Sequence, residues 1–400
     1  MTRPPLSRRD FLRSGALFAG AGLLPGMAGL PAAGTLFAPA KRKTKRAIVV
    51  VFGGGVRTRE TLESGNTPNL DRIAAEGVVY PKVSAQNIGH YGAAVSILTG
   101  SYEVYGIREN ARPNLPTVFE SLRKGADLGA SDVWLSTAGS DQESNYAYST
   151  ARGYGAPYGA NLIGGDGVFN DEFKQLISAK TGFDRLGPGD KGIPRLDPEA
   201  ESTLAAMRGG VRTPLSVAGE GAGSINDPES AARVERYILQ ELRGATAAIT
   251  GVGASDAKAI QVARTLFSVF RPKVLGVTLR DADVAHGSYN DYVTVIKRND
   301  EELGKLFDEI KRDPELAEST AFFVMPEFGR DRDFNARRGL DHGDESPELH
   351  EVALVAWGPD FHTGRVQRSE VQTIDLAPTV LDLFGVRAKS SGAVLRGLYS

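Results

Sequence analysis

Two carboxylates and a histidine follow directly on a short apolar segment in the second half of the chain. Residues 274–279 read VLGVTL, a run of the kind that forms a buried β-strand. Asp281, Asp283 and His286 lie within the next few residues. Charged side chains are costly to bury unless they are paired or bound to a metal. This pattern at the carboxyl end of a strand therefore predicts a binding site.

Two later segments supply further polar groups. Residues 321–325 form another apolar run that leads into Glu327 and Arg330, and the segment GLDHGD at residues 339–344 contains His342. If the apolar runs are neighbouring parallel strands, these loops converge at one edge of the sheet. The chain has no cysteine, so any metal ion would be held by histidine, aspartate or glutamate.

The composition favours an ordinary globular protein. The chain has 400 residues, of which 41% are hydrophobic and 24% charged, enough for one large α/β domain or two smaller ones. A formal net charge of −2 gives no reason to expect a polyanionic partner. We therefore expect no nucleic-acid partner.

The first 40 residues resemble a twin-arginine export signal. Arg8 and Arg9 precede a weakly hydrophobic run at residues 14–30 that is rich in glycine and alanine. A basic membrane anchor is the alternative, but the run is short and rich in glycine for a spanning helix. The resemblance predicts a leader over residues 1–40 and a periplasmic or secreted protein that is free of the membrane after cleavage.

Apolar runs alternate with helical patterns along the rest of the chain. We expect strands at residues 47–52, 78–80, 132–136, 274–279, 321–325 and 352–357. We expect helices at residues 67–77, 115–122, 231–242, 257–270, 291–311 and 374–384, and a loop that passes into a helix near residues 89–90 within the segment 87–100. The alternation predicts an α/β fold with a mostly parallel sheet covered by helices on both faces. It also predicts a single domain over residues 41–400, with insertions rich in glycine and proline at about 141–224.

Several segments occur in the order found in one large family. They are AIVVVFGGG, TPNLDRIAAEGVVY, SILTGSY, DADVAHG, FFVMPEFG, LDHGD, LVAWGPDFHTG and IDLAPTVLDLFGV. Together they resemble the alkaline phosphatase superfamily of sulfatase-like, phosphodiesterase-like and phosphoglycerate-mutase-like hydrolases. The likeness covers residues 46–400, although residues 141–256 contribute almost nothing. The leader, with EFGRD and GLDHG, looks more like the exported sulfatase-like branch called DUF1501. The resemblance implies a three-layer α/β sandwich with a mostly parallel central sheet.

The resemblance also implies a metal centre. Asp283, His286 and His342 match the ligands of one metal site of the family, with Glu327 or Asp281 as a fourth group. Which aspartate serves stays open, because the family often spaces its aspartate and histidine by four positions. Zinc is the expected ion, and manganese, calcium or iron are compatible with these ligand types. The alternative for the two histidines is a hydrogen-bonded pair without a metal.

The family's second metal site and nucleophile have no counterpart in this chain. The metal-binding aspartate after the first strand corresponds to Gly53 or a neighbouring glycine. A later Asp–His pair corresponds to Glu327 and Phe328, and the nucleophile corresponds to His90. These replacements imply a single metal ion and direct attack by water, with Glu327 or His90 as general base.

Two arginines are candidates for binding the substrate anion. Arg57 and Arg330 lie after the first strand and after residues 321–325, and a bidentate contact would suit a phosphate or sulfate group. Ion pairing within the protein is the alternative for both. The sequence thus predicts an exported metal-dependent hydrolase of small-molecule phosphate or sulfate esters. The alternative is a catalytically inactive relative that binds a ligand or a partner protein.

Overall fold

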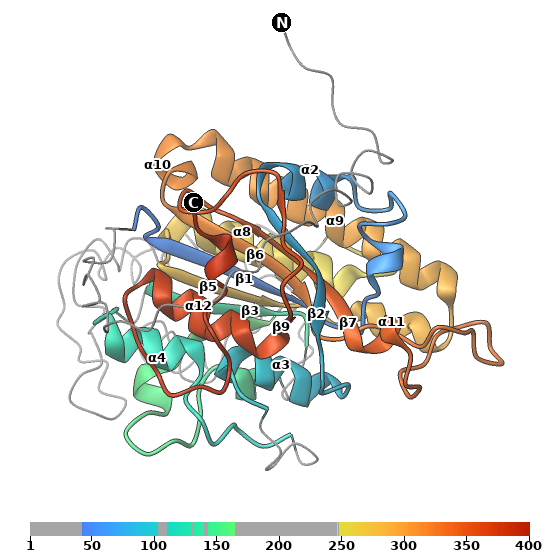
Figure 1. Ribbon diagram of the computed structural model, residues 1–400, viewed down its shortest axis with the longest axis horizontal. Coiled ribbons are helices and arrows are strands. Elements are labelled where there is room, and N and C mark those ends of the chain that lie inside the picture. The colour runs from blue at the N-terminus through green and yellow to red at the C-terminus, as the bar shows by residue number, and fades with distance from the viewer. Residues whose placement is uncertain (1–41, 103–109, 130–131, 140–142, 165–245, 247) are drawn as a thin grey trace, which may run out of the picture. The chain divides into compact units, whose positions relative to one another are not determined.

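A nine-stranded sheet forms the centre of the molecule (Figure 1). The computed structural model describes residues 42–102, 110–129, 132–139, 143–164, 246 and 248–400, and the chain from residue 42 onward clusters as one compact unit. The strands are β1 (Arg46–Phe52), β2 (Val78–Ser84), β3 (Val133–Thr137), β4 (Asn161–Gly164), β5 (Val274–Thr278), β6 (Thr320–Pro326), β7 (Glu351–Trp357), β8 (Arg365–Val366) and β9 (Val371–Gln372). Their order in the sheet is β4-β3-β5-β1-β6-β7-β2-β8, with β9 also paired to β2.

Most neighbouring strands run parallel. Strand β7 is antiparallel to both β6 and β2, and the other pairings are parallel. The predicted mostly parallel sheet is therefore confirmed. The strands β4, β8 and β9 were not predicted, because segments of two to four residues are too short to show a periodic pattern.

Strand β1 shows why the apolar runs are continuous. All of its residues are buried, and successive side chains point to opposite faces of the sheet. Ile48 and Val50 join the hydrophobic cluster on one face, whereas Val49 and Val51 join the cluster on the other. A strand that is covered on both faces needs apolar residues at every position.

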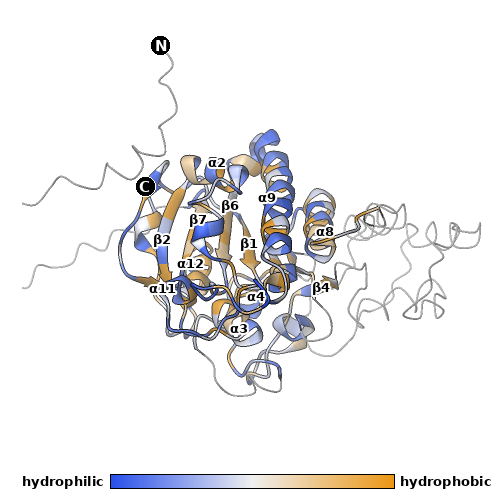
Figure 2. Ribbon diagram, turned by 90° about the vertical axis from the view of Figure 1, so that its right-hand side faces the viewer, coloured by the Kyte–Doolittle hydropathy of each residue, from blue (hydrophilic) through white to orange (hydrophobic). Residues whose placement is uncertain are grey.

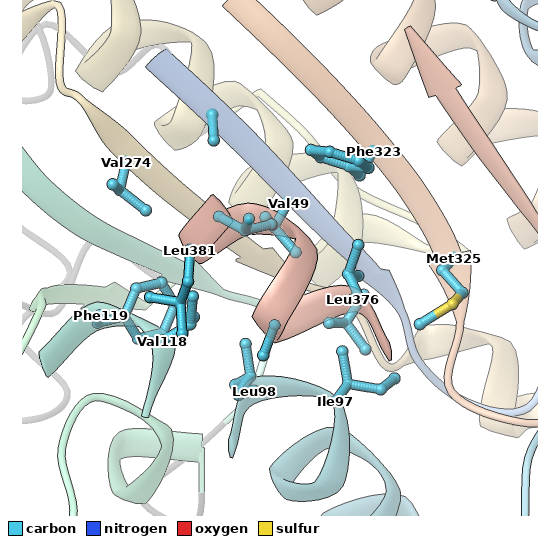
Figure 3. Packing of buried hydrophobic residues seen from close by; sticks show 14 of the residues in the cluster. Val49, Ile97, Leu98, Val118, Phe119, Val274, Phe323, Met325, Leu376 and Leu381 are labelled. Atoms are coloured by element: carbon cyan, nitrogen blue, oxygen red, sulfur yellow. The ribbon is translucent and has the colours of Figure 1, made fainter. Parts of the chain in front are cut away.

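Helices cover both faces and complete the three layers. One face carries α2 (Pro68–Glu76), α8 (Ala254–Phe270) and α9 (Tyr289–Arg312). The other face carries α3 (His90–Thr99), α4 (Val118–Gly125) and α12 (Leu376–Leu383), whose side chains pack against the sheet in Figure 3. The short helices are α10 (Pro314–Ala317) and α11 (Pro347–His350).

Helix α9 illustrates how the sequence specifies a surface helix. Ser288 caps its first turn by accepting a hydrogen bond from the Asp291 amide, and Lys311 and Arg312 complement the helix dipole at its end. Its predicted apolar face, which includes Leu303 and Phe307, is buried. The rest of α9 is mostly hydrophilic, as Figure 2 shows.

Some predicted segments lie outside the described residues. They are the leader at residues 1–40, the helix at 231–242 and most of the insertion at 141–224. Among the residues that the structure does describe, no helix has the length and apolar character needed to cross a membrane.

Candidate metal centre

The carboxyl ends of three adjacent parallel strands position the centre. Val51 of β1 pairs with Thr278 of β5 on one side and with Met325 of β6 on the other, so the three strands end at the same level. After β5 the chain forms the 3₁₀ helix η5 (Asp281–His286), and after β6 it continues through Glu327. The first residue of α3 and the loop that contains His342 complete the site.

Four side chains converge at this edge: His90, Asp283, His286 and His342. One ligand atom of each lies within 4.8 Å of the ligand atoms of the others. Asp283 Oδ1 is 3.0 Å from His90 Nε2 and 3.3 Å from His286 Nε2. The ring centre of His342 lies 4.9 Å from that of His90 and 5.0 Å from that of His286. The structure thus brings His90 together with the three residues that the sequence matched to a metal site.

Two of the imidazoles are held by carboxylates on the side away from the cluster. His90 Nδ1 lies 2.6 Å from Glu327 Oε1, and His286 Nδ1 lies 2.7 Å from Asp341 Oδ1. When the ring is neutral, each carboxylate favours the tautomer in which Nδ1 donates, which leaves the Nε2 lone pair facing the cluster. Histidine ligands of metals are commonly held in this way.

The glycines after β1 allow this arrangement by letting the backbone approach η5 closely. Gly54 and Gly55 have φ angles of +85° and +66°, and a Cβ on Gly54 would lie 2.5 Å from the Asp283 nitrogen. Their amides donate to Glu327 Oε1 at 2.8 and 3.3 Å. Because Glu327 is only 4% exposed and lies behind His90, it orients that ring rather than facing the cluster directly.

Arg330 lies inside the centre and is completely buried. Its Nη2 donates to Asp283 Oδ1 at 2.5 Å, and its Nη1 donates to His286 Nε2 at 3.1 Å. Other N–H groups of the guanidinium donate to the carbonyls of Gly54 and Leu340. Its donors therefore bind protein groups, which differs from the predicted bidentate contact with substrate.

Arg57 also binds groups of the protein. Its guanidinium makes two hydrogen bonds to Glu60, of 2.7 and 2.6 Å, and both side chains are only 2% exposed. It also donates to the carbonyls of Asp331 and Arg332. The structure thus places Arg57 in the ion pair that the sequence left open as the alternative to substrate binding.

Asp281 lies apart from the four-residue cluster. Its Oδ2 accepts hydrogen bonds from the amides of Ser255 and Asp256, at 2.8 and 3.1 Å, in the first turn of α8. Two other histidines also lie elsewhere: His350 Nδ1 is near the Ala85 carbonyl, and His362 Nε2 is near Arg365. The contacts of Asp281 are those of a helix-capping residue.

The charges of the centre shift the pKa values of its members. Burial disfavours the charged form of His90, but the carboxylates of Glu327 and Asp283 raise its pKa to about 9. Burial also opposes ionisation of Asp283, yet the contacts with His90 and Arg330 hold its pKa well below the usual range. Burial and the positive charges of Arg330 and His90 lower the pKa of His342 to about 4, so its imidazole is neutral at pH 7.

The donor set fits a divalent metal ion in three respects. Two ligands bound tetrahedrally to one ion at 2.0–2.1 Å are about 3.4 Å apart, close to the 3.3 Å between Asp283 Oδ1 and His286 Nε2. His90 Nε2 is buried and lies 3.0 Å from Asp283 Oδ1 without forming a hydrogen bond, so it can bind an ion once the ring is deprotonated. The neutral His342 ring keeps a lone pair for coordination. Arg330 is the one feature that opposes a metal, because it contacts two of the four ligand atoms.

Comparison with known proteins shows which solved structures share this fold. No family model and no curated protein matches the sequence. Among solved structures, wild-type alkaline phosphatase PafA matches over 90% of this chain and 99% of its own, with a TM-score of 0.53 and 11% identity. The chain has an alkaline-phosphatase-like fold. A mutant of PafA matches over the same shares, with a TM-score of 0.55 and 10% identity. Murine ectonucleotide pyrophosphatase/phosphodiesterase 5, as an inactive variant with AMP, matches over 89% of this chain and all of its own, with a TM-score of 0.48 and 12% identity.

Sequence reasoning missed two groups that support this four-residue cluster. Asp341 holds His286, and Asn335 Nδ2 in turn donates to Asp341 Oδ1 at 2.9 Å and to the His286 carbonyl at 3.1 Å. The position of Asp341 immediately before His342 was a signal that could have identified it. Asn335 carries no such signal, because its role depends on how the loop folds back.

Proposed function

We propose that this protein is an exported metal-dependent hydrolase of phosphate or sulfate esters that works with a single metal ion. The convergence of His90, Asp283, His286 and His342 carries the proposal, since two of the rings are held by carboxylates as metal ligands commonly are. The resemblance of the sequence to the exported sulfatase-like branch of the alkaline phosphatase superfamily supports it. The fold is compatible with that resemblance.

In this proposal each group of the centre has a distinct role. Asp283, His286 and His342 hold the ion, which when bound would act as a Lewis acid and lower the pKa of a water molecule. His90 would donate a proton to the leaving-group oxygen, because its Nε2 faces the cluster and its pKa of about 9 keeps the ring protonated at neutral pH. Glu327 positions His90, and Arg330 adds a fixed positive charge near the anionic substrate.

Zinc is the metal that we propose, because imidazole nitrogens dominate the cluster. Manganese and iron suit the same donors, whereas calcium prefers a site made of oxygen ligands. The twin-arginine pattern at Arg8 and Arg9 supports export to the periplasm or beyond. The substrate class is a small-molecule ester whose anionic group meets the positive charge of the centre.

The test compares metal content and turnover in the purified protein. We expect about one bound metal ion per chain and hydrolysis of para-nitrophenyl phosphate or sulfate that a chelator abolishes. The change His286→Ala should lower kcat/KM at least about 100-fold, because it removes a ligand. The matched control His350→Ala removes a histidine outside the cluster and should leave kcat/KM unchanged. Bound metal without turnover on a broad panel of phosphate and sulfate esters would contradict the proposal.

One observation favours a second candidate function. Arg330 and the imidazolium form of His90 place two positive charges in the centre without any metal. A catalytically inactive protein could use this charge to bind an anionic ligand. Calorimetry with inorganic phosphate and sulfate on chelator-treated protein distinguishes the hydrolase from the anion-binding protein. If the protein is a metal-dependent hydrolase, the metal-free form should not bind these anions.

A further inference from the structure

We propose that the Arg330 guanidinium competes with the metal ion: it contacts two of the ligand atoms, and a metal ion must break its hydrogen bond to His286 in order to bind. The inference rests on the metal site of the proposed function and not on ester hydrolysis. It assigns to Arg330 the control of metal affinity, a role different from substrate binding.

The guanidinium spans the same two atoms that one metal ion would bridge. Its Nη2 contacts Asp283 Oδ1 at 2.5 Å and its Nη1 contacts His286 Nε2 at 3.1 Å. These two acceptors lie 3.3 Å apart, close to the separation of two ligands on one tetrahedral ion, about 3.4 Å. The two Nη groups of the planar guanidinium therefore donate hydrogen bonds to the two atoms that an ion would otherwise bind.

The competition at His286 is exclusive. Its Nδ1 is bound to the carboxylate of Asp341 at 2.7 Å, so its Nε2 is the acceptor nitrogen. A neutral imidazole offers one lone pair, which can accept a hydrogen bond from Arg330 or bind a metal ion, but not both. Loading the site with metal thus requires the Nη1–His286 hydrogen bond to break.

Arg330 cannot leave the site when that bond breaks. The side chain has no exposed surface, and its Nε and Nη2 are held by the carbonyl of Gly54. Arginine also keeps its charge at all accessible pH values. The guanidinium therefore remains beside the incoming cation and repels it, which weakens binding and accelerates release.

Arg332 provides a matched control on the same loop. It is exposed and pairs with Glu348 at 3.0 Å, and it makes no contact with the four-residue cluster. The change Arg332→Gln removes the same charge from the same segment as Arg330→Gln. Because the change in net charge is the same, a difference between the two variants reports the buried position of Arg330 beside the ligand atoms.

The experiment measures the dissociation constant for Zn²⁺ by competition with a fluorescent chelator, on the full-length protein without substrate. Arg330→Gln should bind Zn²⁺ at least about tenfold more tightly than the wild type, and Arg332→Gln should match the wild type within about twofold. Arg330→Lys keeps the charge but cannot span both ligands, so its affinity should fall between these values. Equal or weaker binding by Arg330→Gln would overturn the inference.

A measurement on the unmodified protein covers the case in which the Arg330 variants do not fold. Addition of Zn²⁺ should shift the side-chain ¹⁵N resonances of Arg330 and leave those of Arg332 in place. Unchanged Arg330 resonances at saturating Zn²⁺ would overturn the inference. If Arg330→Gln hydrolyses esters but binds Zn²⁺ as the wild type does, only this inference is refuted. If Arg330→Gln binds Zn²⁺ more tightly but no variant hydrolyses an ester, only the proposed hydrolase function is refuted.

Discussion

Two buried arginines flank the same edge of the sheet but are neutralised in different ways. Arg57 and Arg330 are among the largest fully buried side chains of the described residues. The carboxylate that pairs with Arg57 is Glu60, which is only 2% exposed. The carboxylate that pairs with Arg330 is Asp283, whose side chain is 48% exposed. A buried pair is closed to other partners, whereas a pair with an accessible carboxylate leaves that carboxylate open to a metal ion.

The Arg57 pair supports the site without belonging to it. Its guanidinium donates to the carbonyls of Asp331 and Arg332, at the start of the loop that leads to His342. Tyr289 donates a further hydrogen bond to Glu60 at 3.2 Å. One arginine therefore fixes the backbone of the loop, and the other contacts the side chains that could do chemistry.

The largest expected effect is on stability, when the buried Arg57–Glu60 ion pair is broken. The change Glu60→Gln leaves the charge of Arg57 buried and uncompensated, which should lower the free energy of unfolding by about 3–5 kcal/mol. Asp283→Asn should cost less, about 1–2 kcal/mol, because water reaches the position of its side chain. Urea unfolding of both variants measures the two costs. Equal costs would show that the two arginines do not differ as described.

The next effect concerns the carboxylate that holds His286. Asp341→Asn keeps the shape of the side chain but weakens its hold on the ring, so affinity for Zn²⁺ should fall by about 10–100-fold. Asp344→Asn is the control, because Asp344 accepts hydrogen bonds from Ser346 and from the Arg332 amide, not from a histidine of the cluster. Competition with a chelator measures the Zn²⁺ affinity of both variants. Similar losses in both would mean that the loop as a whole, rather than Asp341, supports the site.

The smallest effect is on the ionisation of His90. NMR titration of the metal-free protein should give a pKa of about 9, and Glu327→Gln should lower it by removing a carboxylate from Nδ1. The pKa of His90 in the folded protein exceeds the ordinary value of about 6.5. The stability that protonated His90 contributes is therefore fully present below about pH 6.5 and is lost as the pH rises through 9.

The stability that His90 contributes is modest. Its side chain is 36% exposed, so screening by solvent reduces the contribution to about 1 kcal/mol. His90→Gln does not titrate, and it should remove that part of the pH dependence of unfolding between pH 6.5 and 9. A wild-type protein whose stability does not change over this range would contradict the raised pKa.

Most of the architecture could be predicted because local patterns encode it. The continuous apolar runs identified β1, β5, β6 and β7, since buried parallel strands are apolar on both faces. The spacing of Leu303, Leu306, Phe307 and Ile310 identified the buried side of α9. These elements needed no knowledge of distant contacts.

The choice between Asp281 and Asp283 shows where sequence reasoning stopped. In the 3₁₀ helix η5, residues three positions apart lie on the same side, which places Asp283 beside His286. Asp281 is five positions from His286, and its carboxylate instead caps α8. The sequence did not show that the segment forms a 3₁₀ helix, and so it could not decide which aspartate joins the cluster.

The sequence by itself determined the order of the longer strands and helices and the ends of strands at which polar residues accumulate. Only the tertiary structure decided which polar atoms meet. His90 and Glu327 are separated by 237 positions and lie 2.6 Å apart, and Arg330 reaches the carbonyl of Gly54 across 276 positions. Apolar periodicity is a property of neighbouring residues, whereas the partner of a buried charge is set by the packing of segments that are distant in the chain.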